Sequence, residues 1–187
     1  RGTPTMYYGD ELGMRNVPIG PEVVQDPFEK HEPGKGNGRD PERTPMPWDA
    51  TRNGGFTTSE TPWLPLGDNV QCNVESQMDD PDSLLIMVRN LLRLRAAHPA
   101  LMIGSHQALP SKEPIAAYVR HHDDEYLYIL INFADETMSY PLPVIHPEVL
   151  FSTVPGDSMP IIDETGVHLR SGEGVILKVS PTAQGSS

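Results

Sequence analysis

The feature that most constrains the fold is a long stretch, residues 14–80, with neither helical nor strand periodicity. Glycine and proline are crowded into this stretch, and both residues interrupt regular secondary structure. A structureless loop of this length is uncommon inside a compact domain and usually serves a function. We therefore expect residues 14–80 to form a functional loop.

The middle of this loop changes from flexible to stiff. Glycines occupy alternate positions in residues 34–38 and lead into Arg39. After Arg39, the residues Pro41, Pro45 and Pro47 fix the backbone at alternate or nearby positions. The pattern predicts a hinge followed by a rigid segment that holds its side chains in fixed positions.

A helix is predicted over residues 81–98, where apolar side chains recur at helical spacing. Pro81 can occupy its first turn with Asp80 as the cap, and Pro99 ends it. Its apolar face, residues 84–94, is broad, so we expect this helix to dock on a large surface.

The remainder, residues 103–180, has the short apolar runs and turn spacings of an antiparallel β-sandwich. Residues 181–187 are expected to be a disordered tail, and Thr3–Gly9 a short strand. Five strands are predicted in the second half, with a polar turn at His121–Glu125: Ile115–Arg120, Tyr126–Phe133, Met138–Leu142, Glu148–Ser152 and Gly174–Val179.

Composition excludes several classes of function. The chain carries 26 acidic and 14 basic residues, a net charge of −12, which disfavours nucleic-acid binding and favours a neutral substrate. Cys72 is the only cysteine, so no disulfide framework is expected, which fits a reducing cytoplasm. No apolar run reaches the roughly 20 residues that span a bilayer. The first residue is not Met, so we interpret the chain as a fragment whose start lies upstream.

Two motifs resemble glycoside hydrolase family 13, the α-amylase superfamily. Gly2–Glu11 fits the pattern Gly-x-Pro-x-x-Tyr-Tyr-Gly-x-Glu of the family's eighth barrel strand. Gly38–Trp48, Gly-Arg-Asp-Pro-Glu-Arg-Thr-Pro-Met-Pro-Trp, resembles the following loop in the α-glucosidase and oligo-1,6-glucosidase branch. Leu94–Leu101 is similar to the end of the family's last barrel helix.

The resemblance implies a fold that is α/β plus all-β. Residues 1–102 would be the last strand, long loop and last helix of a (β/α)8 barrel, and residues 103–180 a C-terminal β-sandwich. The family's nucleophilic Asp, acid/base Glu and second Asp follow strands four, five and seven, so no catalytic residue lies in this chain. The resemblance thus implies part of an exo-acting retaining α-glucosidase, inactive alone and packed on the missing barrel.

The resemblance also assigns binding residues. Arg43 would reach the sugar at the non-reducing end and pair with an Asp outside this sequence, closing the pocket. Arg39 would lie nearby, toward the next sugar or holding the loop, and Asp40 could order either arginine. Asp40, Trp48 and Tyr8 are interpreted as loop support. The plainer interpretation is a pair of surface ion pairs, Arg39 with Asp40 and Glu42 with Arg43.

Other candidates are assigned structural roles. Glu11 is expected to brace the loop rather than to catalyse, Tyr7 and Tyr8 to lie in a barrel core, and Met46 and Trp48 to pack under the loop. The adjacent His121 and His122 are expected to be solvated in the turn, and Asp79, Asp80 and Asp82 to cap the helix rather than to bind calcium. No metal or cofactor is expected.

Three alternatives remain open. Sucrose isomerases and α-glucosyltransferases share this branch and its motifs. A free-standing carbohydrate-binding β-sandwich comes from another class, but the predicted sheet shows no exposed aromatic platform. The third is a structural remnant of a truncated gene product. The small oligosaccharide substrate would be bound only through the parent enzyme.

Overall fold

The computed structural model describes residues 3–112, 114–142, 147–154, 156 and 159–179. The chain divides into two compact units. The first, Thr5–Arg89, is called the loop unit; the second, Asn90–Ser187 with Arg1–Pro4, is called the sheet unit. The division falls inside a helix, α3 (Leu84–Ala97).

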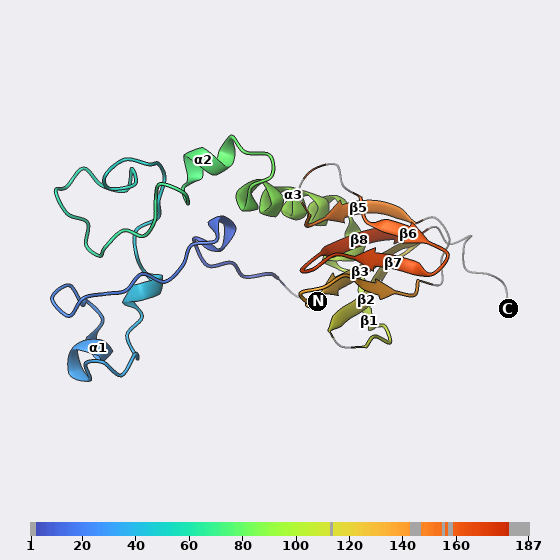
Figure 1. Cartoon of the computed structure of the whole chain (residues 1–187), viewed down its shortest axis with the longest axis horizontal. Helices are drawn as coiled ribbons and strands as arrows, with labels where there is room; N and C mark the ends of the chain where they lie inside the picture. Colours follow the sequence, from blue (N-terminus) through green and yellow to red (C-terminus); the bar gives the residue numbers. More distant parts are fainter. Residues whose placement is uncertain (1–2, 113, 143–146, 155, 157–158, 180–187) are drawn as a thin grey trace. The chain divides into compact units, whose positions relative to one another are not determined.

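Before α3, the loop unit contains only short helical turns joined by irregular chain (Figure 1). Its elements before α3 are η1 (Asp10–Leu12), α1 (Pro27–His31), η2 (Asp40–Glu42) and α2 (Val74–Met78). None of its residues, all of which are described, belongs to a strand. Residues 14–80 contain no helix longer than five residues. This agrees with the lack of helical or strand periodicity in the sequence of this stretch.

The strand predicted over Thr3–Gly9 is wrong. Residues 3–7 are irregular and lead into a turn, and Tyr7 and Tyr8 are 48% and 41% exposed rather than in a core. A strand exists through its ladder of hydrogen bonds to a neighbour, and no described strand pairs with this segment. The chain turns instead at Gly9, whose φ of 92° is left-handed and where a Cβ would lie 2.5 Å from Met14 Sδ.

Helix α3 begins at Leu84, three residues later than the sequence predicted. Ser83 caps it, because its Oγ accepts a hydrogen bond from the Ile86 N–H at 3.2 Å. Asp80, the predicted cap, accepts from the Asp82 N–H at 2.9 Å in the turn before the helix. Pro99 opens a further helix, α4 (Pro99–Met102), after the single residue His98.

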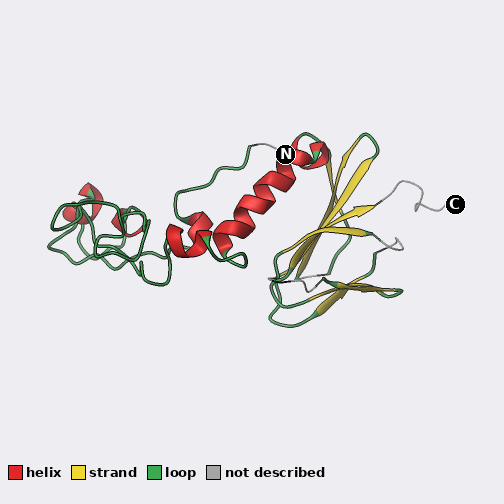
Figure 2. Ribbon diagram, turned by 90° about the horizontal axis from the view of Figure 1, so that it is seen from above, coloured by secondary structure: helices red, strands yellow, loops and turns green. Residues whose placement is uncertain are grey.

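The sheet unit holds two antiparallel sheets (Figure 2). The strands are β1 (Ser105–Ala108), β2 (Ile115–His122), β3 (Glu125–Asn132), β4 (Met138–Tyr140), β5 (Glu148–Ser152), β6 (Ile161–Asp163), β7 (Gly166–Leu169) and β8 (Gly174–Val179). One sheet has the order β1-β2-β3-β8-β5 and the other β4-β7-β6. Three short strands, β1, β6 and β7, were not predicted, and β5 and β8 have the predicted bounds.

The core of the sheet unit draws on both sheets. Val119, Leu130 and Leu177 from the larger sheet pack in one cluster with Tyr140 and Leu169 from the smaller one. The two sheets therefore share one apolar core.

The opposite face of the larger sheet is covered as well. Ala100 and Leu101 of α4 pack against Leu127, Ile129 and Ile176. Strand β3 is therefore buried on both faces, which explains why its sequence is a continuous apolar run rather than an alternating one.

The turn predicted at His121–Glu125 is shorter in the structure. Strand β2 continues to His122 and β3 starts at Glu125, so only two residues turn, with Asp123 at a φ of 49°. His121 is not solvated in a turn but stacks on Tyr126 with ring centroids 4.0 Å apart. The tail predicted at residues 181–187 lies outside the described residues.

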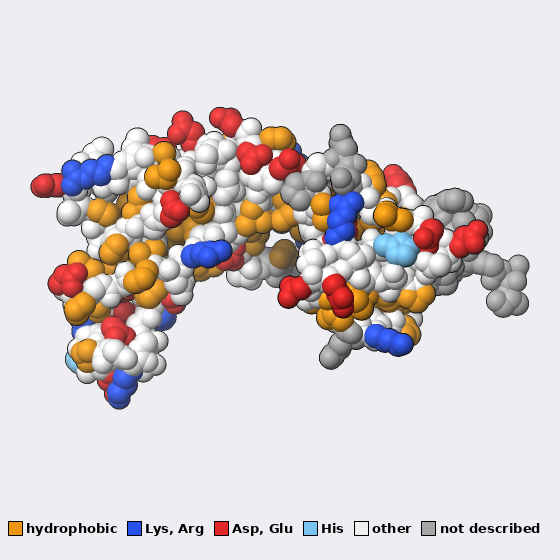
Figure 3. Space-filling model, in the orientation of Figure 1, with side chains coloured by type: hydrophobic (Ala, Val, Ile, Leu, Met, Phe, Trp, Pro, Cys, Tyr) orange, Lys and Arg blue, Asp and Glu red, His pale blue; other side chains and the backbone are white. Residues whose placement is uncertain are grey.

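On the face seen in Figure 3, acidic side chains are scattered over the surface and do not gather into one patch. This distribution agrees with a solvated acidic surface. Among the described residues, no helix is long and apolar enough to cross a membrane.

Candidate functional site

Both arginines of the Gly38–Trp48 segment reach one carboxylate, that of Asp26. Arg39 Nε lies 3.5 Å and Arg43 Nη1 3.4 Å from Asp26 Oδ2. Asp26 is only 2% exposed, whereas both arginine side chains are partly exposed. The structure therefore brings the two predicted binding residues together through a residue that the sequence reasoning missed.

Asp26 is fixed by the fold on its own side. Its Oδ1 accepts a hydrogen bond from the Phe28 N–H at 2.9 Å, which caps α1, and Pro27 fills the first helical position. Its Oδ2 also accepts from the Arg39 N–H at 3.3 Å. The Phe28 N–H and then Arg39 hold the pKa of Asp26 below its usual value, against the opposing effect of burial. The Asp-Pro pair is the sequence signal that could have located it.

Asp40 does not pair with either arginine. Its Oδ2 accepts hydrogen bonds from the backbone N–H groups of Gln25 at 2.6 Å and Asp26 at 2.8 Å, and the residue is 3% exposed. The prediction that Asp40 orders an arginine directly is therefore wrong. Its contact with the arginines is indirect, through the backbone that carries Asp26. The surface pairs Arg39–Asp40 and Glu42–Arg43 are likewise replaced by pairs with Asp26.

Arg43 also lines a cavity of about 390 Å³. Three exposed aromatic side chains share its wall: Trp48, 51% exposed, Trp63, 50%, and Phe56, 43%. The expectation that Trp48 packs under the loop is wrong for its side chain. Its backbone is the part that is held, with its N–H 2.7 Å from Gly54 O and its carbonyl 3.0 Å from Glu75 N.

The N-terminal segment closes one side of the same cavity, which Tyr8 and Glu11 also line. The Tyr8 hydroxyl donates a hydrogen bond to the Thr44 carbonyl at 2.9 Å, which joins two segments 36 residues apart. Burial and then the neighbouring Tyr7 raise the pKa of Tyr8, so it is a neutral donor. Glu11 accepts from the Gly9 N–H at 2.9 Å and thus braces the turn.

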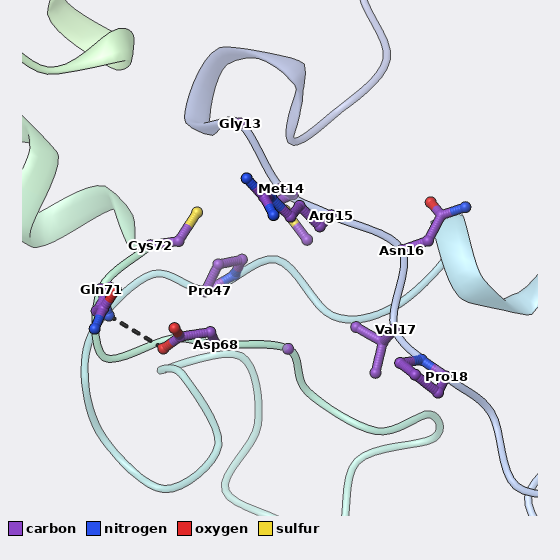
Figure 4. Close-up of a pocket in the computed structure, with 11 residues that line it drawn as sticks. Gly13, Met14, Arg15, Asn16, Val17, Pro18, Pro47, Asp68, Gln71 and Cys72 are labelled. Carbon is purple, nitrogen blue, oxygen red and sulfur yellow. Dashed lines mark hydrogen bonds between the residues drawn. The ribbon is translucent and has the colours of Figure 1, made fainter.

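A second cavity, of about 600 Å³, lies between Gly13–Pro18 and the turn Gly67–Cys72 (Figure 4). It contains none of the predicted binding residues. The Cys72 thiol on its wall lies 3.3 Å from the Leu12 carbonyl, and burial and then Asp68 raise the pKa of this thiol. Cys72 is therefore not an activated nucleophile. In the described ranges, no three His, Cys, Asp or Glu side chains are grouped as a metal site requires.

A protein-family model matches more than half of the chain. Residues 1–104 fit the model of the α-amylase catalytic domain. The matched range contains Arg39, Arg43, Asp26 and the aromatic cavity, so the candidate site lies wholly within it.

Curated relatives cover most of this chain. The oligo-1,6-glucosidase of Parageobacillus thermoglucosidasius is 32% identical over 96% of the chain, and the trehalose-6-phosphate hydrolase of Bacillus subtilis is 32% identical over 76%. The chain spans only 36% and 29% of these two relatives.

Solved structures agree with the chain closely. An α-glucosyl transfer enzyme, XgtA, superposes with a TM-score of 0.81 and 32% identity, over 92% of this chain and 32% of that one. The trehalulose synthase MutB of Pseudomonas mesoacidophila MX-45 gives a TM-score of 0.82 and 30% identity, over 96% and 36%.

Proposed function

The chain belongs to the α-amylase family, and from this premise we propose that it is the C-terminal part of an exo-acting, retaining α-glucosidase that hydrolyses short α-glucosides. Residues 1–102 would complete the catalytic (β/α)8 barrel, and residues 103–180 would be a C-terminal β-sandwich. The proposal agrees with a chain that spans about a third of its relatives.

The observation that carries the proposal is the position of Arg43. Its guanidinium contacts Asp26 through Nη1 and also lines the cavity shared by Trp48 and Trp63. A guanidinium offers several donors in a fixed plane, which suits sugar hydroxyls. Indole rings beside it supply apolar faces of the kind that pack on sugar rings. We assign this cavity as one wall of the sugar pocket, with Arg43 at the chain end of the substrate.

Bond cleavage would be carried out by residues elsewhere in the complete enzyme. A retaining glycosidase needs a carboxylate nucleophile and a carboxylic acid about 5 Å apart. No described residue of the candidate cavity supplies such a pair, because Glu11 is its only carboxylate and braces a backbone turn. This chain alone is therefore expected to be inactive.

Arg43→Ala in the complete enzyme tests the assignment. Removing a donor that contacts the substrate is expected to lower kcat/KM for isomaltose or maltose about a hundredfold. Arg52→Ala, an exposed arginine of the same loop outside the cavity, is the matched control and should keep the wild-type value. A wild-type kcat/KM for Arg43→Ala would remove the role proposed for it.

A second candidate outcome is transfer of the glucosyl group to another sugar rather than to water. It is favoured by the likeness to the α-glucosyl transfer enzyme and the trehalulose synthase. Product analysis with sucrose and with maltose separates the two reactions. Glucose release supports hydrolysis, whereas new disaccharides or longer sugars support transfer or isomerisation.

We also propose that α3 packs on the rest of the barrel. Leu91 and Leu92 are 38% and 43% exposed in this chain, and an exposed apolar face of this kind favours association. The isolated chain is expected to self-associate, as measured by sedimentation. A monomer with a sharp, cooperative melt that includes residues 1–101 would argue against this packing.

A further inference from the structure

Asp26 is the most heavily used carboxylate of the loop unit. One oxygen, Oδ2, is within reach of three donors: the Arg39 N–H at 3.3 Å, Arg39 Nε at 3.5 Å and Arg43 Nη1 at 3.4 Å. The other oxygen caps α1. The two oxygens thus have separate tasks, one toward the helix and one toward the arginines.

The environment of Asp26 favours an ordering role. Its side chain is fully buried, so Oδ2 has no solvent position to which it can rotate at low cost. Its backbone N–H donates to the buried Asp40 at 2.8 Å, which fixes the residue from behind. Arg39 and Arg43, by contrast, are 55% and 37% exposed, and a long exposed side chain samples many rotamers unless a partner holds it.

We propose that Asp26 is a positioning residue of the sugar site, which holds Arg39 and Arg43 in the orientation that binds the substrate. The expected effect of Asp26 on catalysis rests on the proposed function. The ordering of Arg39 and Arg43 by Asp26 does not. Asp26 itself does not line the cavity and is not proposed to contact sugar.

Asp26→Asn tests this inference selectively, because asparagine has the same shape and is an equally good helix cap. With its oxygen on the helix side, the amide nitrogen would replace Oδ2 and repel both guanidinium groups. We expect kcat/KM for a short α-glucoside to fall about ten- to a hundredfold in the complete enzyme, because misplacement by about 1 Å carries such a cost. A value within about twofold of wild type would overturn the inference.

The matched control is Asp49→Asn. Asp49 Oδ1 also accepts a backbone N–H, that of Thr51 at 2.8 Å, but its carboxylate contacts no arginine among the described residues. This variant should keep the wild-type kcat/KM. An equal loss in both variants would assign the effect to loop stability and overturn a positioning role.

A double-mutant cycle separates positioning from general damage. The cycle treats the two arginines as one partner: if Asp26 acts through them, then Asp26→Asn should change kcat/KM by less than about threefold when Arg39→Ala and Arg43→Ala are both already present. A structural defect would instead lower the activity by the same factor in both backgrounds. That additive result would overturn the inference.

A last measurement does not depend on activity or on the variant being folded. In the wild-type complete protein, modification by phenylglyoxal, followed by peptide mass spectrometry, should be slower at Arg39 and Arg43 than at Arg52. Equal rates at all three would overturn the ordering role. If the wild-type protein hydrolyses no α-glucoside but the two arginines are protected, the proposed function fails while the ordering role of Asp26 stands.

Discussion

The sheet unit and the loop unit are each stabilised by a different kind of interaction. The sheet unit buries apolar side chains on both faces of its larger sheet, among them Leu127, Leu130 and Leu177, all 0% exposed. In the loop unit only Leu12, Leu64 and Leu85 are buried hydrophobic residues. Apart from Pro45 and Pro47, its other buried side chains are polar, and most of them bond to backbone groups: Asp26, Asp40, Thr44, Asn73 and Ser83.

The difference shows how an irregular chain can present side chains in defined positions. A sheet gains stability in proportion to the apolar area that it buries, about 25 cal/mol per Å². A loop rich in Gly and Pro has little apolar area to bury, so its backbone N–H groups must be satisfied one by one. Each side chain that satisfies them fixes a turn, and the turns in sequence place Arg39, Arg43 and Trp48.

The largest effect is expected in the sheet unit. Leu130→Ala removes a fully buried side chain and leaves a cavity, which should cost about 3 kcal/mol in the free energy of unfolding. Phe133→Ala, at a position that is 69% exposed directly after β3, is the control and should cost less than about 1 kcal/mol. Urea unfolding followed by circular dichroism measures both. Equal costs would contradict an apolar core as the source of stability.

A smaller effect is expected for a polar anchor of the loop unit. Asn73, 1% exposed, accepts from the Ser76 N–H at 2.7 Å and donates to the Asn69 carbonyl at 2.8 Å. Asn73→Ala should cost about 1–2 kcal/mol. Trp48 and Trp63 are the only tryptophans and both lie in the loop unit, so their fluorescence reports its unfolding. Asn73→Asp retains the cap acceptor and should recover part of the loss.

Acid should weaken the sheet unit through Asp163. Hydrogen bonds from Thr165, and then from His168, lower the pKa of Asp163 to about 2. A folded-state pKa below the ordinary 3.8 means that this stabilisation is present above about pH 4 and is lost as the pH falls through 2. Asp163→Asn should therefore show a smaller loss of Tm between pH 4 and 2 than the wild type. Parallel curves would show that Asp163 contributes nothing.

The smallest effect concerns the thiol of the loop unit. Burial raises the pKa of Cys72, so iodoacetamide at pH 8 should alkylate it more slowly than a cysteine in a short peptide. Urea should abolish the difference. Rapid alkylation of the native protein would show that the segment around Leu12 and Cys72 opens readily and is less ordered than its hydrogen bonds indicate.

The sequence predicted the regular parts of the molecule better than the positions of side chains. The bounds of β5 and β8 were predicted because apolar runs between turn residues mark strands. The strands β1, β6 and β7 were missed because they are short and gain their order from their neighbours. In the same way, Thr3–Gly9 has the composition of a strand but no described partner with which to pair.

At the candidate site, the motif located the arginines and the structure supplied their partner. Asp26 lies 13 and 17 residues before Arg39 and Arg43, and no local spacing rule relates carboxylates and arginines over such distances in a loop. The adjacent Asp40 was the natural choice by proximity along the chain. It was wrong because its carboxylate faces the backbone of Gln25 and Asp26.

The shared oxygen of Asp26 also has a consequence for how this loop can change during evolution. Replacing both arginines would leave a buried anion without its cations, and replacing Asp26 alone would release two cations at once. Positions 26, 39 and 43 are therefore expected to covary among homologues. Lineages that lose the two arginines should carry a neutral residue at position 26, such as the helix-capping Ser or Asn.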